Sequence, residues 1–369
     1  MPPTSWAEHA EEAGLPHFFD GAERAAAIII LPLMFVGLVV NAFVAYLFWR
    51  HESLRRHPSN LLILSLCVGD GVLLCLPRVF EVPTALAFNG YPAWWHPFCQ
   101  LFGAMPLIST YMSGLALSVV SLERYAAIVK GYAITRRQTC FLIAGIWAGG
   151  LTMGVLLPIV TAVGKGTPST PFVLQSSGLY CLIDWGDSSP AGRAQVVIAI
   201  CTIGATIGAL GGGYFLIWLH VKRLSGTVSA TPRSLTLTPS EREQESAQLR
   251  SNASSTVGMK SAMSTIERSL MMKGVIMSTS FVIAWSPYTC MILYEGILAR
   301  HNVPRGFETL SYFGANVNAM INPILFIVLD TRVLATARRA LGIATAEDDW
   351  LEPASAIGSA ASRKREYRR

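Results

Sequence analysis

The feature that most constrains this chain is a set of long apolar segments, each about long enough to cross a lipid bilayer. The first, AAAIIILPLMFVGLVVNAFVAYLFW at 25–49, contains no charged residue. A bilayer core about 30 Å thick needs about 20 consecutive apolar residues in a helix. Only 14% of the 369 residues are charged, against about 25% in soluble domains. The chain is therefore expected to be an integral membrane protein.

Seven such segments follow one another along the chain, and they predict an all-α membrane protein, a bundle of seven transmembrane helices. No internal repeat accompanies them. The expected spans are 25–49, 59–82, 98–130, 138–162, 194–222, 268–298 and 306–329.

The positive charges between the spans predict the topology. The segments after spans one, three, five and seven carry basic residues such as Arg55, Arg56, Lys222 and Arg223, whereas residues 82–98 carry none. By the positive-inside rule the N-terminus lies outside and the C-terminus in the cytoplasm. The net charge of +6 then reflects loop bias, so no nucleic-acid partner is expected.

This topology divides the chain into an outer tail (1–24), a membrane domain (25–342) and a cytoplasmic tail (343–369). The loop at 223–266 is rich in Ser and Thr and lacks apolar periodicity, so disorder and phosphorylation are expected there. After span seven, Val333, Ala337 and Leu341 share a helical face, which predicts a short amphipathic helix on the inner leaflet.

Asp70 is a charged residue near the middle of span two. A charge at this depth costs at least about 2.5 kcal/mol and needs a reason. Ser113, Asn318 and Asn322 occupy similar depths in spans three and seven, and oxygen ligands of this kind suit a small cation or a proton. The alternative is a hydrogen-bonded hub that only packs the bundle.

Charged residues also meet at the cytoplasmic side of spans three and six. Arg124 and Glu123 are adjacent, and should point to different sides of their helix, while Glu267 opens span six. Arg124 and Glu267 can clamp the two spans together. The alternative is a pair of charges that reach separately toward the interface.

Pro287 interrupts span six and should kink it, because proline removes a backbone hydrogen bond. Trp285 and Phe281 lie one helical turn apart beside the kink. A kinked helix with a charge clamp at its end is suited to two-state movement. On the opposite side, Cys99 and Cys181 share an oxidising compartment in which they can join.

Taken in order, these motifs resemble those of the rhodopsin-like (class A) G-protein-coupled receptors over residues 25–342. The matching elements are Asn41, the segment NLLILSLCVGD ending at Asp70, Cys99 with Cys181, ERY at 123–125, Trp147, WSP at 285–287 and NPILF at 322–326. The resemblance implies a disulfide between Cys99 and Cys181, a plasma-membrane location and no enzymatic activity.

The same resemblance implies roles for individual residues. Arg124, within Glu123-Arg124-Tyr125, would hold the inactive state through Glu123 and Glu267 and then contact the G protein. The activation switch would further include Phe281, Trp285, Pro287, Asn322, Pro323 and Phe326, and the allosteric sodium site Asp70, Ser113, Asn318 and Asn322. Expected partners are a heterotrimeric G protein, a receptor kinase, arrestin-like proteins and the lipid bilayer.

Within that class the sequence motifs are most similar to those of the opsins, as in GLYCLIDW around Cys181. Opsins carry a lysine, at the position of Asn316, that binds retinal through a Schiff base. An amide nitrogen is not a nucleophilic amine and cannot form that imine. Phe102 and Gln175 also replace acidic counterions. No covalent cofactor is therefore expected, and noncovalent retinal is an alternative that is not favoured.

The resemblance places a ligand pocket among spans three, six and seven and the outer loop. Its expected residues are aromatic or apolar with few polar points, which favours a small, largely apolar ligand. Pro106 replaces the aspartate of amine receptors, which argues against an amine. The expected lining is Pro106, Leu107, Thr110, Tyr111, Asp184, Trp285, Tyr288, Thr289, Ile292, Tyr312, Phe313 and Asn316.

Three departures from the family pattern concern activation. Phe326 replaces the tyrosine of the NPxxY motif, span five has no proline, and Gly114 stands where a bulky aliphatic residue is usual. A decoy receptor that does not couple is therefore an alternative. A pump or membrane enzyme is disfavoured, because span seven lacks a lysine and all seven histidines lie in tails, loops or span ends.

Overall fold

The computed structural model describes residues 21–56, 58–88, 91–164, 171–175, 177–227, 272–299 and 303–345. Seven helices in this part of the chain are long and apolar enough to cross a membrane. The predicted seven-helix bundle is therefore confirmed. Most residues of the expected tails and of the loop at 223–266, and also Glu267, lie outside the described residues.

The helices follow in the predicted order, some with π-helical turns. Span one is α2 (Gly21–Arg50), and the short α3 (Glu52–Arg55) leads to span two. Span two consists of α4 (Pro58–Gly69), the π-turn η1 (Asp70–Cys75) and α5 (Leu76–Phe88). Span three is α6 (His96–Lys130), preceded by the 3₁₀ turn η2 (Ala93–Trp95). Span four consists of α7 (Arg136–Leu151), η3 (Thr152–Leu156) and α8 (Leu157–Gly164).

The second half of the bundle begins with span five, α9 (Pro190–Thr227). Span six (Met272–Ile297) ends in the π-helical η4 (Tyr294–Ala299). Span seven is α11 (Arg305–Leu329), and α12 (Thr331–Ala340) follows it. Two short strands, β1 (Phe172–Leu174) and β2 (Cys181–Ile183), pair between spans four and five.

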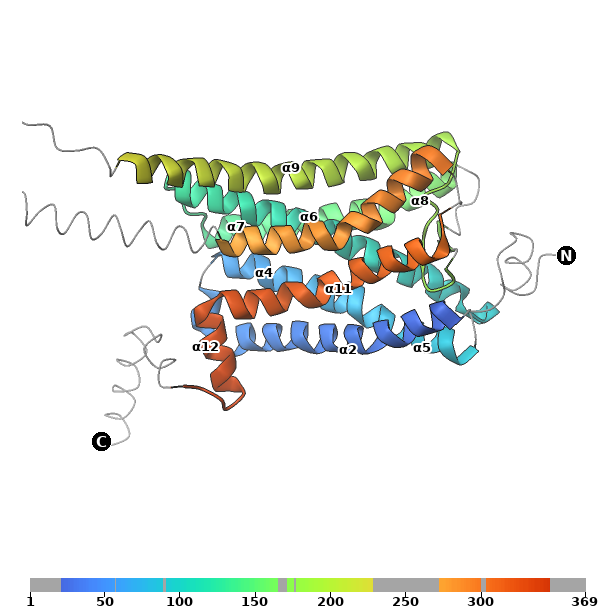
Figure 1. The fold of residues 1–369 in the computed structure, drawn as a ribbon, viewed down its shortest axis with the longest axis horizontal. Helices are drawn as coiled ribbons and strands as arrows, with labels where there is room; N and C mark the ends of the chain where they lie inside the picture. The colour runs from blue at the N-terminus through green and yellow to red at the C-terminus, as the bar shows by residue number, and fades with distance from the viewer. Residues whose placement is uncertain are drawn as a thin grey trace, which may run out of the picture.

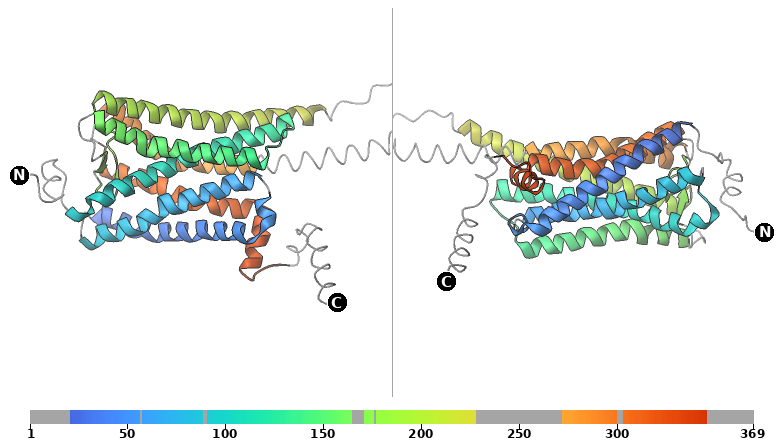
Figure 2. Two further views of the ribbon diagram at one scale, coloured as in Figure 1. Left: turned by 180° about the vertical axis from the view of Figure 1, so that it is seen from behind. Right: turned by 90° about the horizontal axis from the view of Figure 1, so that it is seen from below.

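The spans lie side by side along one long axis (Figure 1), and α12 turns across one end of the bundle. The strands lie at the opposite end, near the start of α2. Both further views show the same arrangement (Figure 2). Helix α6 is central, because it contacts α4, α7, α9 and both strands.

Glycines let span four approach span three closely. A Cβ atom on Gly154 would lie 2.6 Å from the Cγ1 atom of Ile108, and Gly150 also faces Ile108. Small residues at such contacts allow helix backbones to pack tightly in a membrane. The Trp147 indole adds a bond to the Ser65 hydroxyl at 2.9 Å, which links span four to span two.

The proline in span six leaves a carbonyl that another side chain satisfies. Pro287 cannot donate to the carbonyl of Ile283, and the Ser286 hydroxyl donates to that oxygen at 2.9 Å. Gly314 of α11 faces the neighbouring Ala284 carbonyl, where a Cβ atom would approach to 2.7 Å. The kink therefore rests directly against span seven.

The strands form a lid over one end of the bundle. We call residues 171–175 and 177–185 the plug. Leu174 pairs with Cys181 in an antiparallel register, and the turn between the strands includes Gly178 at φ 68°. A disulfide joins Cys181 to Cys99 at the start of α6. This pairing confirms the expected bridge and ties the plug to span three.

Candidate functional site

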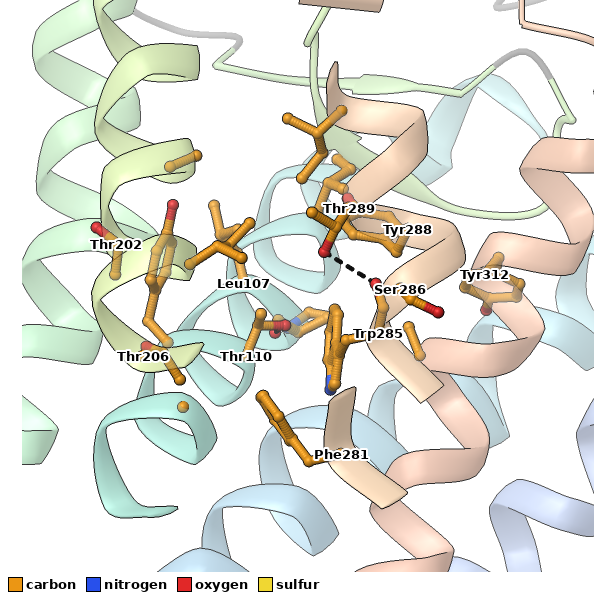
Figure 3. A pocket seen from close by; sticks show the side chains of 18 of the residues that line it. Leu107, Thr110, Thr202, Thr206, Phe281, Trp285, Ser286, Tyr288, Thr289 and Tyr312 are labelled. Carbon is orange, nitrogen blue, oxygen red and sulfur yellow. Dashed lines mark hydrogen bonds between the residues drawn. The ribbon is translucent and has the colours of Figure 1, made fainter. Parts of the chain in front are cut away.

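A cavity of about 210 Å³ lies in the bundle below the plug. In Figure 3, Thr202 and Thr206 of α9 face Thr289 and Trp285 of span six across it. Leu107 and Thr110 of α6 contribute a further wall, and Tyr312 lies on the span-seven side. Leu74 and Arg78 of span two also line the cavity, so five spans and the plug converge on one space.

Ten of the twelve residues expected to line a pocket lie around this cavity. Asp184 and Phe313 do not line it: Asp184 accepts a hydrogen bond from the Gly186 amide at 3.0 Å, and Phe313 packs against the main apolar cluster. The ten lining residues are Pro106, Leu107, Thr110, Tyr111, Trp285, Tyr288, Thr289, Ile292, Tyr312 and Asn316.

Asn316 is a buried amide at the cavity wall. Its Nδ2 atom donates to the backbone carbonyl of Tyr312 at 2.6 Å, so this atom is occupied within its own helix. Its Oδ1 atom has no hydrogen-bond partner among the described residues. The side chain therefore offers an acceptor and no amine at this position.

A buried ion pair stands at the span-two side of the cavity. Arg78 and Glu81 bond to each other and are only 2% and 0% exposed. The Arg78 guanidinium carbon lies 5.0 Å from the centre of the Tyr312 ring, and Tyr312 stacks on Tyr180 of the plug at 4.2 Å. The pair is neutral as a unit, and its cation is further stabilised by the ring faces.

Polar contacts hold the plug against the spans around it. The Glu308 carboxylate accepts bonds from the amide and hydroxyl of Ser177, and the Tyr91 hydroxyl donates to the Leu179 carbonyl at 2.8 Å. Burial raises the pKa of the Tyr180 phenol well above its usual value, as does the nearby Glu308 carboxylate. The plug therefore presents a neutral phenol to the cavity.

Aromatic side chains form the floor of the cavity at the kink in span six. The rings of Phe281 and Trp285 are 6.1 Å apart, and Tyr288 meets Trp285 edge-on at 5.6 Å. The Trp185 indole of the plug donates to the Tyr288 hydroxyl at 3.0 Å. Gly114 also lines the cavity, and a Cβ atom there would lie 3.9 Å from Phe281. A ligand can therefore act directly on the kinked segment.

Below the floor, Asp70 is the centre of a buried polar cluster. Its Oδ1 atom accepts bonds from Ser109 at 3.0 Å and Ser113 at 2.7 Å. Its Oδ2 atom accepts a bond from the Asn322 amide at 3.1 Å. The structure therefore brings together Asp70, Ser113 and Asn322 as expected, and adds Ser109.

Three asparagines of spans one and seven, one of them the Asp70 partner Asn322, have buried amide oxygens without a donor in the part of the protein that the structure describes. Among the described residues, the Oδ1 atoms of Asn41, Asn318 and Asn322 have no hydrogen-bond partner, and neither does the Nδ2 atom of Asn318. Unpaired buried oxygens are costly unless water or an ion satisfies them. A carboxylate, hydroxyls and amide oxygens form a donor set suited to a hard cation.

The charged motif at the α12 end of span three forms a local pair. The Arg124 Nε atom lies 3.4 Å from the Glu123 Oε2 atom. The two side chains were expected to point apart, and this expectation was wrong, because their length lets them meet across adjacent positions. Tyr125 packs beside Tyr214 and Ile217 of α9. The proposed clamp to Glu267 lies outside the described residues.

Phe326 faces an apolar cluster. Its ring stacks on Phe48 of span one at 5.8 Å, with Val333 of α12 in the same cluster. Asn322 and Pro323 lie one turn earlier on α11 and are also buried. A hydroxyl at position 326 would enter this apolar contact, so phenylalanine suits the packing.

The sequence profile described as "7 transmembrane receptor (rhodopsin family)" matches residues 40–326. The chain belongs to this family. The receptor is 25% identical to "Rhodopsin, GQ-coupled" of Mizuhopecten yessoensis over 79% of its own length, and it spans about half (54%) of that relative. It is also 25% identical to human "Visual pigment-like receptor peropsin", over 85% of this chain and 83% of the relative.

A crystal structure of squid rhodopsin shares the fold of the receptor. The TM-score is 0.66, with 20% identity over 89% of each chain. At this identity the likeness shows the fold alone.

Some residues of the receptor's cavity and polar cluster were not anticipated. Ser109 lies one helical turn from Ser113, and that spacing alone could have suggested it. Ile203 and Thr206 face the cavity from α9, but the rotation of a uniformly apolar helix cannot be read from its sequence. The plug residues Tyr180 and Trp185 flank Cys181, so the bridge itself pointed to them.

Proposed function

We propose that the protein is a G-protein-coupled receptor that transmits the binding of a small, largely apolar ligand to a heterotrimeric G protein. The observation that carries the proposal is a mostly apolar cavity in direct contact with the kinked segment of span six, in a chain of this receptor family. The residues around the cavity bind and orient a ligand, and no bond-making chemistry is assigned to them.

Movement of span six about Pro287 is the proposed transmission step. A ligand that repositions Trp285 or Tyr288 favours one of two arrangements of the helix, and its differential affinity for them sets the shift. At the α12 end, Arg124 exchanges its contact with Glu123 for the G protein. Glu267 is the second acidic partner that we assign to the inactive state. Phosphorylation of the intervening loop by a receptor kinase would recruit arrestin-like proteins.

The proposed setting is the plasma membrane, with the plug end outside and α12 on the cytoplasmic side. Loop charge supports this orientation. We also propose that Na⁺ binds at Asp70 with Ser113, Asn318 and Asn322, because the unpaired amide oxygens there suit a hard cation. In this site Na⁺ would stabilise the arrangement of spans two, three and seven that holds the carboxylate.

The direct test is nucleotide exchange by purified Gα proteins of several classes, with the receptor in lipid nanodiscs. Catalysed GTP uptake by at least one class, lost in Arg124→Ala, is the expected result. If exchange stays at the Gα-only rate for every class and every apolar compound tried, a decoy receptor becomes the better description.

The similarity to rhodopsins favours one second candidate, a photoreceptor that holds retinal without a covalent bond. The test is an absorbance spectrum after incubation with retinal isomers, before and after illumination. A visible band that shifts with light would support it, provided that organic solvent extracts the retinal intact, as expected without a covalent bond. Spectra that match those of free retinal would contradict this candidate and favour the receptor that does not respond to light.

A further inference from the structure

Between spans five and six, some side chains that line the cavity are also exposed on the outside of the bundle. Ile207 of α9 and Ser286 and Cys290 of span six all line the cavity. The same three residues are exposed on the outer face of the bundle, Ile207 to 44%. These side chains therefore contribute both to the cavity lining and to the outer face. At this height the cavity therefore reaches the lipid-facing surface.

Two tight contacts bracket this part of the wall. Toward the plug, Gly296 lies against Val196, with no room for a Cβ atom. Toward α12, Gly274 lies against the Tyr214 hydroxyl in the same way. Val196 and Tyr214 are 18 residues apart, which is five helical turns, so both lie on one face of α9. The helices touch at these two points, and Ile207, Ser286 and Cys290 lie between them along the two spans.

Two other sides of the cavity are lined by buried residues among those that the structure describes. Tyr180, Leu182 and Trp185 of the plug are each less than 5% exposed and cover the end that would meet water. On the opposite wall, Tyr312 and Asn316 of α11 are each 2% exposed. A solute therefore meets buried plug residues from the aqueous side, whereas the lining between spans five and six is itself exposed to the outside.

We infer that these three exposed lining residues, Ile207, Ser286 and Cys290, form a window that admits the ligand from the hydrocarbon of the bilayer. The inference rests on the proposed function, since it gives the source of the ligand for that cavity. The ligand class is an apolar molecule that partitions into the membrane leaflet beside the plug. A water-soluble ligand would have to break the plug's bonds to spans two, three and seven.

Photolabelling in phosphatidylcholine nanodiscs tests the window. The probe is an uncharged aryl-diazirine hydrocarbon dissolved in the bilayer. Leu107 and Tyr111 line the cavity on α6 and are buried, so they are labelled only if the probe enters. In the wild-type protein we expect labelled peptides at both residues. In Ile207→Trp combined with Cys290→Trp, their labelling should fall to the level of unilluminated samples.

Matched controls separate entry from general damage. Leu216→Trp adds the same ring to α9 at a lipid-facing site (45% exposed) outside the cavity lining, and it should leave the labelling unchanged. Val197, also lipid-facing, should be labelled equally in every variant. Two outcomes would overturn the inference that the ligand enters through the window. One is the absence of label at Leu107 and Tyr111 in the wild-type protein, and the other is full labelling of both residues in the double variant.

Chemical blocking of the window at Cys290 tests the same inference without relying on the folding of the tryptophan variant. Cys290 is an exposed thiol, and pyrene maleimide delivered through the bilayer should alkylate it and reduce labelling of Tyr111. Cys290→Ser should remain fully labelled after the same treatment, although Cys140 and Cys201 still react. Equal labelling of both treated proteins would contradict the inference. No G protein is present, so a labelled receptor that fails in nucleotide exchange rejects only the signalling proposal.

Discussion

Asp70 is a carboxylate whose three hydrogen-bond donors come from spans three and seven, so one side chain links three helices. The oxygen of the Asn322 amide that bonds to it lacks a donor within the described part of the chain. The residue thus combines a bundle-packing role with the ligand set of a cation site. These two readings differ in one measurable property, the response to Na⁺.

Asp70→Asn should remove the stabilisation of the receptor by Na⁺. Na⁺ at about ten times its Kd stabilises the protein that binds it by about 1.4 kcal/mol, which raises Tm. We expect wild-type Tm to rise when choline chloride is replaced by NaCl, and Asp70→Asn to show no rise. Thr110→Ala is the control, since the Thr110 hydroxyl bonds only to the Pro106 carbonyl. An unchanged Na⁺ response in Asp70→Asn would show that Asp70 does not bind Na⁺.

Asn316→Lys should restore the chemistry that the amide excludes. The lysine amine would stand at the cavity wall, where an aldehyde such as retinal can form an imine with it. We expect a visible band with added retinal and, after borohydride reduction, a mass adduct on the span-seven peptide. Asn316→Arg carries a similar charge without a primary amine and should give neither. A band without the adduct would mean that retinal binds without reacting.

At the scale of elements, the contact of span four with span three depends on glycine. Gly154→Leu should force these helices apart, because its Cβ atom alone would meet Ile108 at 2.6 Å. Overpacking of this kind costs about 1–3 kcal/mol, so Tm should fall. Gly145→Leu is the matched control on the same span, because nothing lies within 4 Å of its Cβ position. Equal Tm values for the two variants would show that the contact is not close.

The sequence was sufficient to predict that the spans exist and in what order they follow, but it predicted their ends less well. Span two was expected to end at residue 82 and continues to Phe88. Arg78 and Glu81 lie close to the expected end, and they pair with each other inside the protein, which permits a buried helix there. Hydropathy measures single residues and cannot register such neutralisation. The bridge between Cys99 and Cys181 was predictable because the family resemblance supplied it.

At the scale of the whole molecule, the cavity and the Glu123–Arg124 pair lie toward opposite ends of the bundle, and span six is the proposed connection. Glu123→Gln should raise basal nucleotide exchange, because it removes the acidic partner of Arg124 at 3.4 Å. An ion pair that is partly exposed is worth about 1 kcal/mol, so the increase should reach about five-fold. Glu52→Gln, which affects an exposed pair with Arg56, should change nothing. Unchanged basal exchange in Glu123→Gln would show that the pair is not inhibitory.

Prediction of the site was limited by rotation and by loop geometry. Residues of spans three, six and seven were placed at the cavity by their family motifs, and Pro106, Trp285 and Asn316 all line it. Span five carried no such motif, so its contribution was missed. Asp184 was expected at the cavity, but its carboxylate caps the turn at Gly186 instead. A sequence does not fix which way a loop side chain turns.

The plug has a consequence for isotope exchange. Backbone atoms of the plug form hydrogen bonds to Glu308 of span seven from Ser177, to Tyr91 near span three from Leu179, and to Glu81 of span two from Cys181. The disulfide from Cys181 to Cys99 adds a covalent link to span three. Loops between helices normally exchange amide hydrogens within seconds to minutes, because they open locally at little cost. Here the amides of Ser177 and Cys181 should take up deuterium as slowly as those of the helices beside them. The plug above the cavity would then exchange like a helix and not like a loop.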